Sequence, residues 1–314
     1  MHRWLLILAL AASATLHAES RYRLQSNPWV NLHQRLMYEA RFGPVPPPAG
    51  LSGGEAAKWK TAVDDYRAYL VKKHPFMTKE LIDLNAALSA TNGANLPDSV
   101  PPAAAAVLNA AMPLYRRAQW AEDDFANRFW ISVAQPMLAS AESELLAAHE
   151  KAYGRPFPKR IVVDVASFGW EFGAYTYGDT EHAHTVIQSI DNPGGEGFYA
   201  LESLLHEPSH AIVDDRSGAI GEDLVRISKE LGIRPYASLW HAILFYTSGE
   251  LTRRALERRG VHDFHPMITL MYDRQFRGMK QALETHWQAY LDGKVSREAA
   301  LRQIVIETAP PPKK

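Results

Sequence analysis

One short stretch, residues 204–215, constrains this chain more than any other because a polar motif interrupts an apolar run there. It reads Leu-Leu-His-Glu-Pro-Ser-His-Ala-Ile-Val-Asp-Asp and contains the pattern His-Glu-x-x-His. On a helix, residues i and i+4 lie on one face, so His206 and His210 can both approach a single metal ion. Glu207 is rotated by about 100° and would stand beside that ion as the general base for an activated water. The stretch predicts a helix that carries a metal site.

Pro208 limits where this helix can begin. Proline has no backbone N–H, and its ring clashes with the carbonyl four residues earlier once a helix is already running. In the first turn of a helix the missing donor costs little. We therefore expect the helix to start near residues 205–207, with Pro208 in its first turn.

A third metal ligand has to come from elsewhere, because a catalytic zinc usually has three protein ligands and one open position. Residues 239–254 are expected to form a buried helix. Gly249 inside it costs about 1 kcal/mol relative to alanine, and the close approach of another backbone is the usual reason for such a glycine. We predict that this neighbour is the helix of the metal motif and that Glu250 is the third ligand.

Two alternatives concern the same helix. His241 lies nine residues before Glu250 and is therefore expected on the opposite face, which is why Glu250 is preferred. Glu250 itself has another interpretation, an ion pair with Arg253 or Arg254 on the helix surface.

The chain resembles the gluzincin (thermolysin-like) group of zinc metallopeptidases. The resemblance lies in the two histidines, the glutamate between them and a helical Gly-Glu pair about 40 residues later. The resemblance covers roughly residues 160–258. It implies that His206, His210 and Glu250 hold Zn²⁺ and that Glu207 is the catalytic base. It also implies a zincin-like fold, in which a small sheet lies against the metal-binding helix.

A change of pattern at Arg160 indicates this sheet. Residues 161–166, 173–177 and 183–190 are short β-branched or aromatic runs separated by Gly, Asp and Asn, which favours an antiparallel sheet. By the resemblance, Thr185 to Ile190 is the edge strand that holds an extended substrate. His182 and His184 alternate toward one face of a strand, so they belong either to a second metal site or to an ordinary polar surface.

Further polar residues are candidates for supporting roles. Tyr246 lies four residues before Glu250 on the same helix face and is the first candidate for stabilising an oxyanion. By the resemblance, Tyr272 and His265 are other candidates, because gluzincins often place such a donor later in the chain. A structural role in the core is the alternative for each. Asp214 could orient a ligand imidazole, or form a solvated acidic pair with Asp215.

The N-terminal half is helical by pattern. Helices are expected over 29–41, 59–70, 78–90, 103–112 and 114–152, with Pro-rich or Gly-rich breaks between them. Later helices are expected over 222–232 and 297–306, with a long helix from about Met267 to Leu291. Aromatic residues in regular stripes are expected to form the core.

The N-terminal residues suggest export and removal of a signal peptide. Residues 1–18 combine Arg3, an apolar run and Leu-His-Ala, which is typical of a secretory signal peptide cleaved near Ala18. The apolar run is shorter than the roughly 20 residues that span a bilayer, and an uncleaved anchor is the alternative. The sequence contains no cysteine, so disulfides and thiolate metal sites are excluded. We expect a periplasmic or secreted protein.

Charge excludes some classes of partner. The 34 Lys and Arg nearly balance the 35 Asp and Glu, which gives no electrostatic argument for nucleic acid or an anionic membrane. No stable membrane span is expected, and the oligomeric state is left open.

The sequence thus predicts an α+β, mostly helical, zincin-like protein with a small antiparallel sheet packed against the metal-binding helix. Residues 1–18 would be the signal peptide, 19–158 a helical region, 159–308 the metal-binding region and 309–314 a disordered tail. The expected function is an exported zinc metallopeptidase that acts on peptides or proteins. The alternatives are a zincin-shaped module that binds peptide or cell wall without cleaving it, and a zinc hydrolase of a non-peptide amide or ester.

Overall fold

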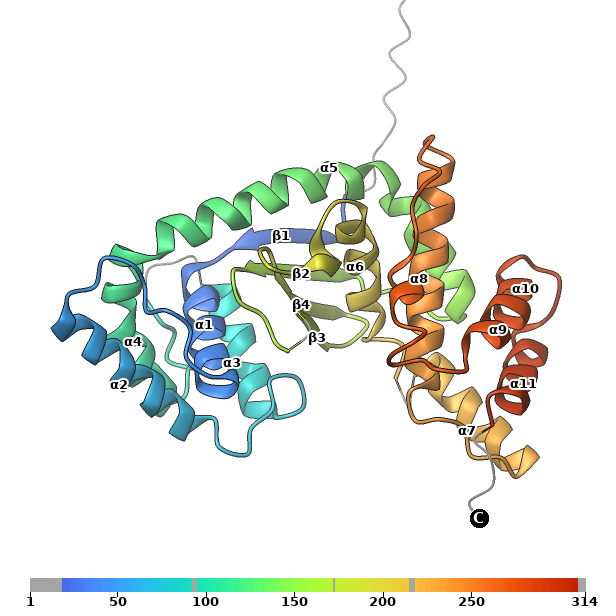
Figure 1. The fold of residues 1–314 in the computed structure, drawn as a ribbon, viewed down its shortest axis with the longest axis horizontal. Helices are drawn as coiled ribbons and strands as arrows, with labels where there is room; N and C mark the ends of the chain where they lie inside the picture. The colour runs from blue at the N-terminus through green and yellow to red at the C-terminus, as the bar shows by residue number, and fades with distance from the viewer. Residues whose placement is uncertain (1–18, 92–94, 172, 215–217, 310–314) are drawn as a thin grey trace, which may run out of the picture.

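A computed structural model describes residues 19–91, 95–171, 173–214 and 218–309 (Figure 1). The predicted signal peptide therefore lies outside the described residues, as does nearly all of the predicted tail. The protein is mostly helical with one small sheet, in agreement with the predicted α+β class. In the described part of the chain, no helix is both long enough and apolar enough to cross a membrane.

The described residues of the N-terminal region form one strand and five helices, as the hydrophobic periodicity largely predicts. Their bounds are β1 (Tyr22–Ser26), α1 (Pro28–Phe42), α2 (Gly53–Tyr69), α3 (Lys79–Ala90), α4 (Pro102–Ala118) and α5 (Trp120–Tyr153). Asn27 caps α1 by accepting hydrogen bonds from the backbone N–H groups of Trp29 and Val30. The strand β1 was not predicted, although Tyr22, Arg23, Leu24 and Gln25 alternate between apolar and polar side chains, the pattern of a half-buried strand.

The sheet is mixed, and the prediction of an antiparallel sheet is wrong. Its strands β2 (Arg160–Ala166), β3 (Ala174–Gly178) and β4 (His182–Gln188) join β1 in the order β1-β2-β4-β3. The pairs β1 with β2 and β2 with β4 are parallel, and only β3 runs antiparallel to β4. Strand direction depends on the path of the long connections, and the helices α1 to α5 between β1 and β2 provide the crossover that parallel strands need.

The two faces of the sheet belong to two different hydrophobic cores. Ala166, Tyr175, Tyr177 and Val186 pack with α1 to α4 on one face. The other face packs against α5, α6 and the C-terminal helices through apolar residues such as Ile161, Val163, Val165, Ala183 and Ile187. The alternation of side chains along each strand produces this division. Figure 1 shows the sheet between the N-terminal helices and α8.

The C-terminal region is a set of shorter elements. They are η1 (Pro193–Gly195), α6 (Phe198–Ser209), α7 (Ala219–Leu231), α8 (Leu239–Glu257), η2 (Met267–Leu270), α9 (Lys280–Ala282), the π-helical segment η3 (Leu283–Trp287), α10 (Gln288–Leu291) and α11 (Arg297–Glu307). The predicted single helix from Met267 to Leu291 is therefore wrong, because turns occupy residues 271–279. Gly278 lies in that break with φ +81°, a conformation that a helix excludes.

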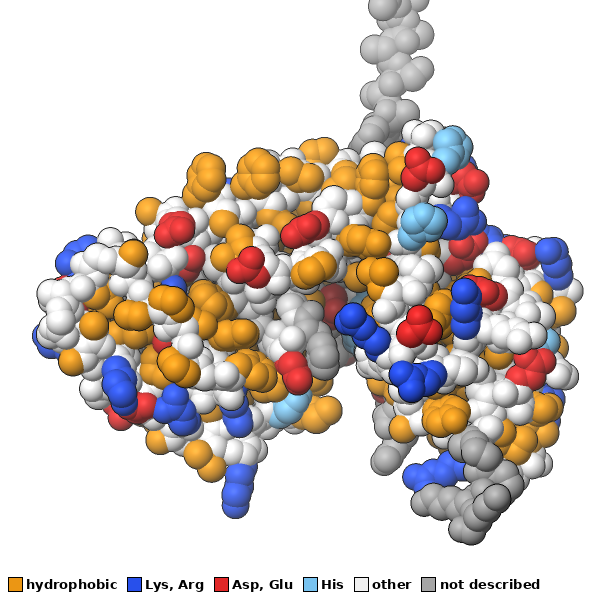
Figure 2. Space-filling view, in the orientation of Figure 1, with side chains coloured by type: hydrophobic (Ala, Val, Ile, Leu, Met, Phe, Trp, Pro, Cys, Tyr) orange, Lys and Arg blue, Asp and Glu red, His pale blue; other side chains and the backbone are white. Residues whose placement is uncertain are grey.

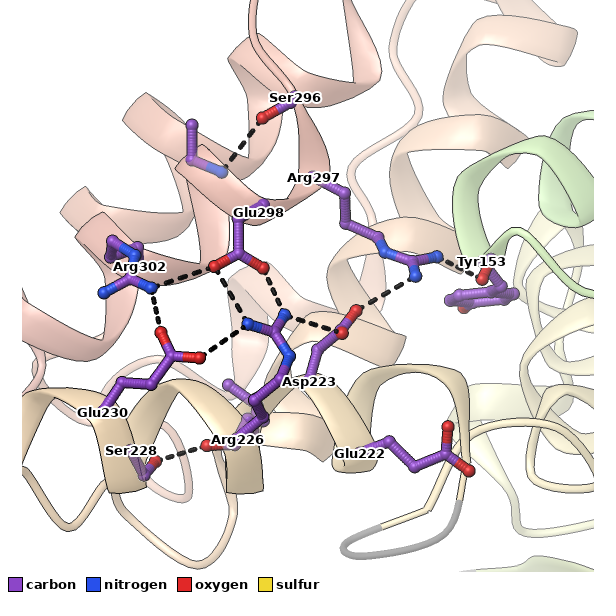
Figure 3. Close-up of polar contacts among 12 residues, drawn as sticks. Tyr153, Glu222, Asp223, Arg226, Ser228, Glu230, Ser296, Arg297, Glu298 and Arg302 are labelled. Atoms are coloured by element: carbon purple, nitrogen blue, oxygen red, sulfur yellow. Dashed lines mark hydrogen bonds and ion pairs between the residues drawn. The ribbon is translucent and has the colours of Figure 1, made fainter.

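An ion-pair network joins α7 to α11 at the surface (Figure 3). Arg226 of α7 contacts Glu298 of α11 as well as Asp223 and Glu230 of its own helix. Arg302 of α11 completes the network by pairing with Glu230 and Glu298. Each pair is partly exposed, so the network fixes the orientation of the two helices more than it adds stability.

Candidate metal centre

Three histidines form the centre of the candidate site. His206 lies in the last turn of α6, His210 directly follows that helix, and His241 lies in the first turn of α8. One ring nitrogen from each histidine lies within 4.8 Å of the other two. Imidazole nitrogens so close together can hold one metal ion. The predicted convergence of His206 and His210 agrees with this structure, but the third member of the group is His241, which the sequence analysis had passed over.

The helices α6 and α8 run antiparallel, and their contacts explain which residue joins the group. Steps of four residues along α6 match steps of four in the opposite direction along α8. The contacting pairs are Glu202 with Gly249, His206 with Phe245, and His210 with His241. The centroids of the His206 and Phe245 rings are 3.9 Å apart, and those of His210 and His241 are 5.1 Å apart. The histidines therefore meet where α6 ends and α8 begins.

Gly249 does allow the close approach that the sequence predicted, but one turn away from His206 and two turns away from His241. A Cβ atom at this position would lie 2.9 Å from Oε1 of Glu202 on α6 and 2.5 Å from Cβ of Pro266. The inference that α6 packs against Gly249 is confirmed. Glu250 itself is not a member of the histidine group. The nine residues of helix between His241 and Glu250 correspond to about 13 Å.

Glu250 instead forms the ion pairs that were its alternative interpretation. Its carboxylate accepts hydrogen bonds from Arg253 at 2.7 and 3.0 Å and from Arg254 at 2.7 Å. Gln288 donates a further hydrogen bond at 3.2 Å. Burial acts to raise the pKa of Glu250, but the hydrogen bonds from the two arginines bring it below its usual value. The lone pairs of Glu250 are thus already occupied.

The predicted oxyanion donors also lie away from the histidines. Tyr246 donates its hydroxyl hydrogen bond to Oε1 of Gln288 at 2.7 Å. Tyr246 and Tyr272 line a separate cavity of about 140 Å³ together with Glu250. His265 is exposed and does not line the cavity of the three histidines. None of these three residues is placed to stabilise charge at the candidate metal centre.

The position of Pro208 differs from the prediction as well. The helix α6 begins at Phe198, ten residues before Pro208, so the proline lies in the last turn and not in the first. There it removes the N–H that would bond to the carbonyl of Leu204. The hydroxyl of Tyr22 on β1 donates a hydrogen bond of 2.7 Å to that carbonyl in its place. A hydrogen bond from the unpredicted strand β1 therefore makes the proline tolerable inside the motif.

All three histidines are held in the neutral form. Burial lowers the pKa of His210 to about 4, and burial together with the nearby His210 lowers that of His241 to about 3. Burial, followed by the nearby rings of His210, His241 and His149, places the pKa of His206 well below its usual value. Neutral imidazole is the form that binds metal. Nδ1 of His206 and Nε2 of His241 are buried and have no hydrogen-bond partner in the described part of the chain, so these nitrogens are not committed to protein groups.

Glu207 stands beside the histidines on the wall of the same cavity. Its Oε2 accepts a hydrogen bond of 3.3 Å from Oγ1 of Thr176 on β3, and Thr176 in turn contacts Thr185 on β4 at 2.9 Å. Burial raises the pKa of Glu207 to about 8, and the hydrogen bond from Thr176 offsets only part of this effect. A carboxyl group with a pKa near neutrality can both accept and return a proton.

A cavity of about 1240 Å³ opens next to these groups. One side is formed by residues of the N-terminal helical region such as Tyr38, His74 and Phe76, and the other by residues such as Trp240 and Met271. Figure 2 shows the surface hollowed between these two sides of the molecule. A cavity of this size is sufficient for a ligand of several residues.

The strand β3 runs along this cavity and is an edge of the sheet. All five of its residues line the cavity, and among the described residues it pairs only with β4. Gly173 and Asp179, which flank β3, form backbone hydrogen bonds across the β3–β4 pair. Hydrogen-bonded positions alternate along an antiparallel ladder, so Tyr175 and Tyr177 also form backbone hydrogen bonds to β4. Ala174, Thr176 and Gly178 consequently direct their backbone N–H and C=O groups toward the free edge. The prediction that Thr185 to Ile190 is the edge is wrong, because β4 lies between β2 and β3.

The remaining candidates take ordinary structural roles. His182 is exposed, and the ring of His184 stacks on Tyr177 at 5.1 Å, so the two are not part of a group of metal ligands among the described residues. Asp214 accepts a hydrogen bond of 2.9 Å from the backbone N–H of Gly218. Asp215, its predicted partner in an acidic pair, lies outside the described residues.

Comparisons of the chain with protein-family models, with curated proteins and with solved structures found no match. The fold and the site define the class: an α+β protein with three converging histidines that can hold a metal ion on the wall of a large cavity.

Proposed function

We propose that this protein is an exported zinc-dependent hydrolase that cleaves peptides. The observation that carries the proposal is the convergence of His206, His210 and His241 beside the half-buried carboxyl group of Glu207. Three neutral nitrogen ligands favour Zn²⁺ among the common divalent ions, and they leave a fourth position open. Export rests on the sequence of residues 1–18 alone.

The three histidines would bind Zn²⁺, which lowers the pKa of a coordinated water and polarises a carbonyl group. Glu207 would accept the proton of the attacking water on Oε1 or Oε2. It would later return this proton to the leaving nitrogen. Thr176 would keep the carboxyl group turned toward the cavity through its hydrogen bond to Oε2. A variant that lacks only the carboxylate should therefore retain metal and lose turnover.

Two features favour a peptide over other amides or esters. The free edge of β3 offers the alternate N–H and C=O groups of Ala174, Thr176 and Gly178, with which an extended peptide can pair as an added strand. Thr176 also contacts Glu207, so a strand added at this edge would pass beside the catalytic base. A small ester would make no use of this edge.

Glu207→Gln tests the proposal directly. We expect purified protein to contain about one Zn²⁺ per chain and to cleave members of a random peptide library, as measured by elemental analysis and mass spectrometry. Glu207→Gln should keep the zinc and reduce cleavage by at least about a hundredfold. The matched control is Glu196→Gln, which changes an exposed carboxylate outside the cavity and should cleave normally.

Three outcomes would contradict the proposal in different ways. Zinc without cleavage by the parent protein would favour the non-catalytic binding module. Cleavage of amide or ester substrates alone would favour the non-peptide hydrolase. A protein that binds no metal at all would remove the basis of both enzymatic alternatives.

A further inference from the structure

A row of aromatic rings forms one side of the cavity, across the free edge of β3 from the metal centre. The ring of His74 lies 4.3 Å from that of Phe76 and 5.1 Å from that of Trp170. All three residues line the cavity and are partly exposed in it. Met77, which follows Phe76 and also lines the cavity, is 74% exposed. The metal centre described above uses none of these side chains.

This aromatic row is continuous with β3. Phe76 stacks on Tyr175 of β3, with ring centroids 5.8 Å apart and planes 29° apart. Tyr175 and Tyr177 point to the face of the sheet that packs against α1 to α4. Thr176, between them, points to the opposite face and contacts Glu207. The two faces of β3 therefore carry the aromatic row on one side and the catalytic carboxyl group on the other.

A peptide paired with β3 would encounter both faces in alternation. Side chains of successive residues in a strand point to opposite faces, and cross-strand neighbours lie about 5 Å apart. A residue opposite Thr176 would point toward Glu207, and its neighbours in sequence would point toward Tyr175 and Phe76. Those neighbouring side chains would lie against the rings of Tyr175 and Phe76, which suits a large apolar or aromatic side chain.

We propose that His74, Phe76 and Trp170 form a subsite that selects peptides with a large apolar or aromatic side chain next to the residue that faces Glu207. This inference rests on the proposed peptidase function and specifies its substrate class. Burial, followed by the nearby charge of Arg41, lowers the pKa of His74, which favours the neutral ring.

The test compares two peptides that differ at one position, Phe in one and Gly in the other, by their ratio of kcat/KM. We expect the parent protein to prefer the Phe peptide by at least about tenfold, since a hydrophobic pocket discriminates on this scale. Phe76→Ala and Trp170→Ala should each reduce that ratio severalfold. The matched control is Phe125→Ala, which removes a 74% exposed ring on α5 and should leave the ratio unchanged.

A second variant guards against loss of folding. Met77→Asp changes an exposed side chain of the same cavity, so the fold should persist. It should lower the ratio for Phe over Gly and raise the relative rate for a Lys peptide. Cleavage with no preference at this position, or a preference that all these variants leave intact, would overturn the subsite while the peptidase function stands.

Binding provides a readout that does not depend on turnover. Titration of Glu207→Gln with the Phe and Gly peptides should show tighter binding of the Phe peptide, and addition of Phe76→Ala should reduce this difference severalfold. If the parent cleaves no peptide but this difference is present, the hydrolase proposal fails and the subsite survives. Equal affinities for the two peptides, or selective binding of an oligosaccharide in their place, would overturn the subsite.

Discussion

The hydroxyl of Tyr22 lies 2.7 Å from the carbonyl oxygen of Leu204, which Pro208 leaves without its helical hydrogen bond. Both groups are buried, and Tyr22 belongs to β1, on the sheet face that α6 covers. The bond links the N-terminal strand to the turn of α6 that bears His206. A buried carbonyl without a partner costs about 1–3 kcal/mol, so this contact contributes to the stability of the metal-binding helix.

Tyr22→Phe should therefore lower the free energy of unfolding of the metal-free protein by about 1–3 kcal/mol. The control makes the same substitution in a Pro208→Ala protein, in which residue 208 has a backbone N–H that can bond to the carbonyl of Leu204. In that background Tyr22→Phe should cost at least about 1 kcal/mol less, and urea denaturation of the four proteins gives this coupling energy. Equal losses in both backgrounds would show that Tyr22 acts through packing and not through the carbonyl.

Glu202 should make stability depend on pH. Its side chain is fully buried, accepts hydrogen bonds from the backbone N–H of Met267 at 3.0 and 3.2 Å, and has a pKa raised by burial to about 8. Between its usual pKa and 8 the folded state binds a proton that the unfolded state does not. Stability therefore falls as pH rises through this window, by up to about 1.4 kcal/mol per pH unit for this group.

Glu202→Gln removes this titration and keeps an acceptor for Met267. We expect denaturation of the metal-free variant between pH 6.5 and 8 to show a shallower decline of stability than the parent. The part of the decline that Glu207 contributes should remain. Identical slopes for the two proteins would contradict a protonated Glu202 in the folded state.

Gly249→Ala tests the packing of α6 against α8. Helix propensity alone favours alanine by about 1 kcal/mol, but the added Cβ would lie 2.5 Å from Cβ of Pro266. We expect the clash to dominate and to lower the free energy of unfolding by about 1–3 kcal/mol. Gly54→Ala is the control, because a Cβ there meets no atom within 4 Å, and it should be neutral or stabilising. A stabilising Gly249→Ala would disprove the close contact.

Local patterns predicted the local parts of this structure and missed the parts set by distant contacts. The i, i+4 spacing of His206 and His210 and the periodicity of the N-terminal helices depend on neighbours in sequence. The parallel pairing of β1 with β2 and the hydrogen bond of Tyr22 to the carbonyl of Leu204 join residues more than 100 positions apart. The face of α8 that meets α6 is likewise a tertiary property. The sequence identified both faces, His241 and Glu250, but periodicity cannot say which one packs against the histidines.

The choice between these two faces can be decided by metal binding. His241→Ala removes one of three nitrogens that lie within 4.8 Å of one another, and should weaken zinc binding by at least about a hundredfold. Glu250→Gln changes a carboxylate already paired with Arg253 and Arg254, and zinc affinity should be nearly unchanged. Ligand binding at 100 times the dissociation constant stabilises a folded protein by about 2.7 kcal/mol, so thermal denaturation with and without chelator reports the affinity. Zinc should raise the melting temperature of the parent and of Glu250→Gln, and should fail to do so for His241→Ala. The reverse result would return Glu250 to the site and would mean that α8 turns its other face toward the metal when the ion is bound.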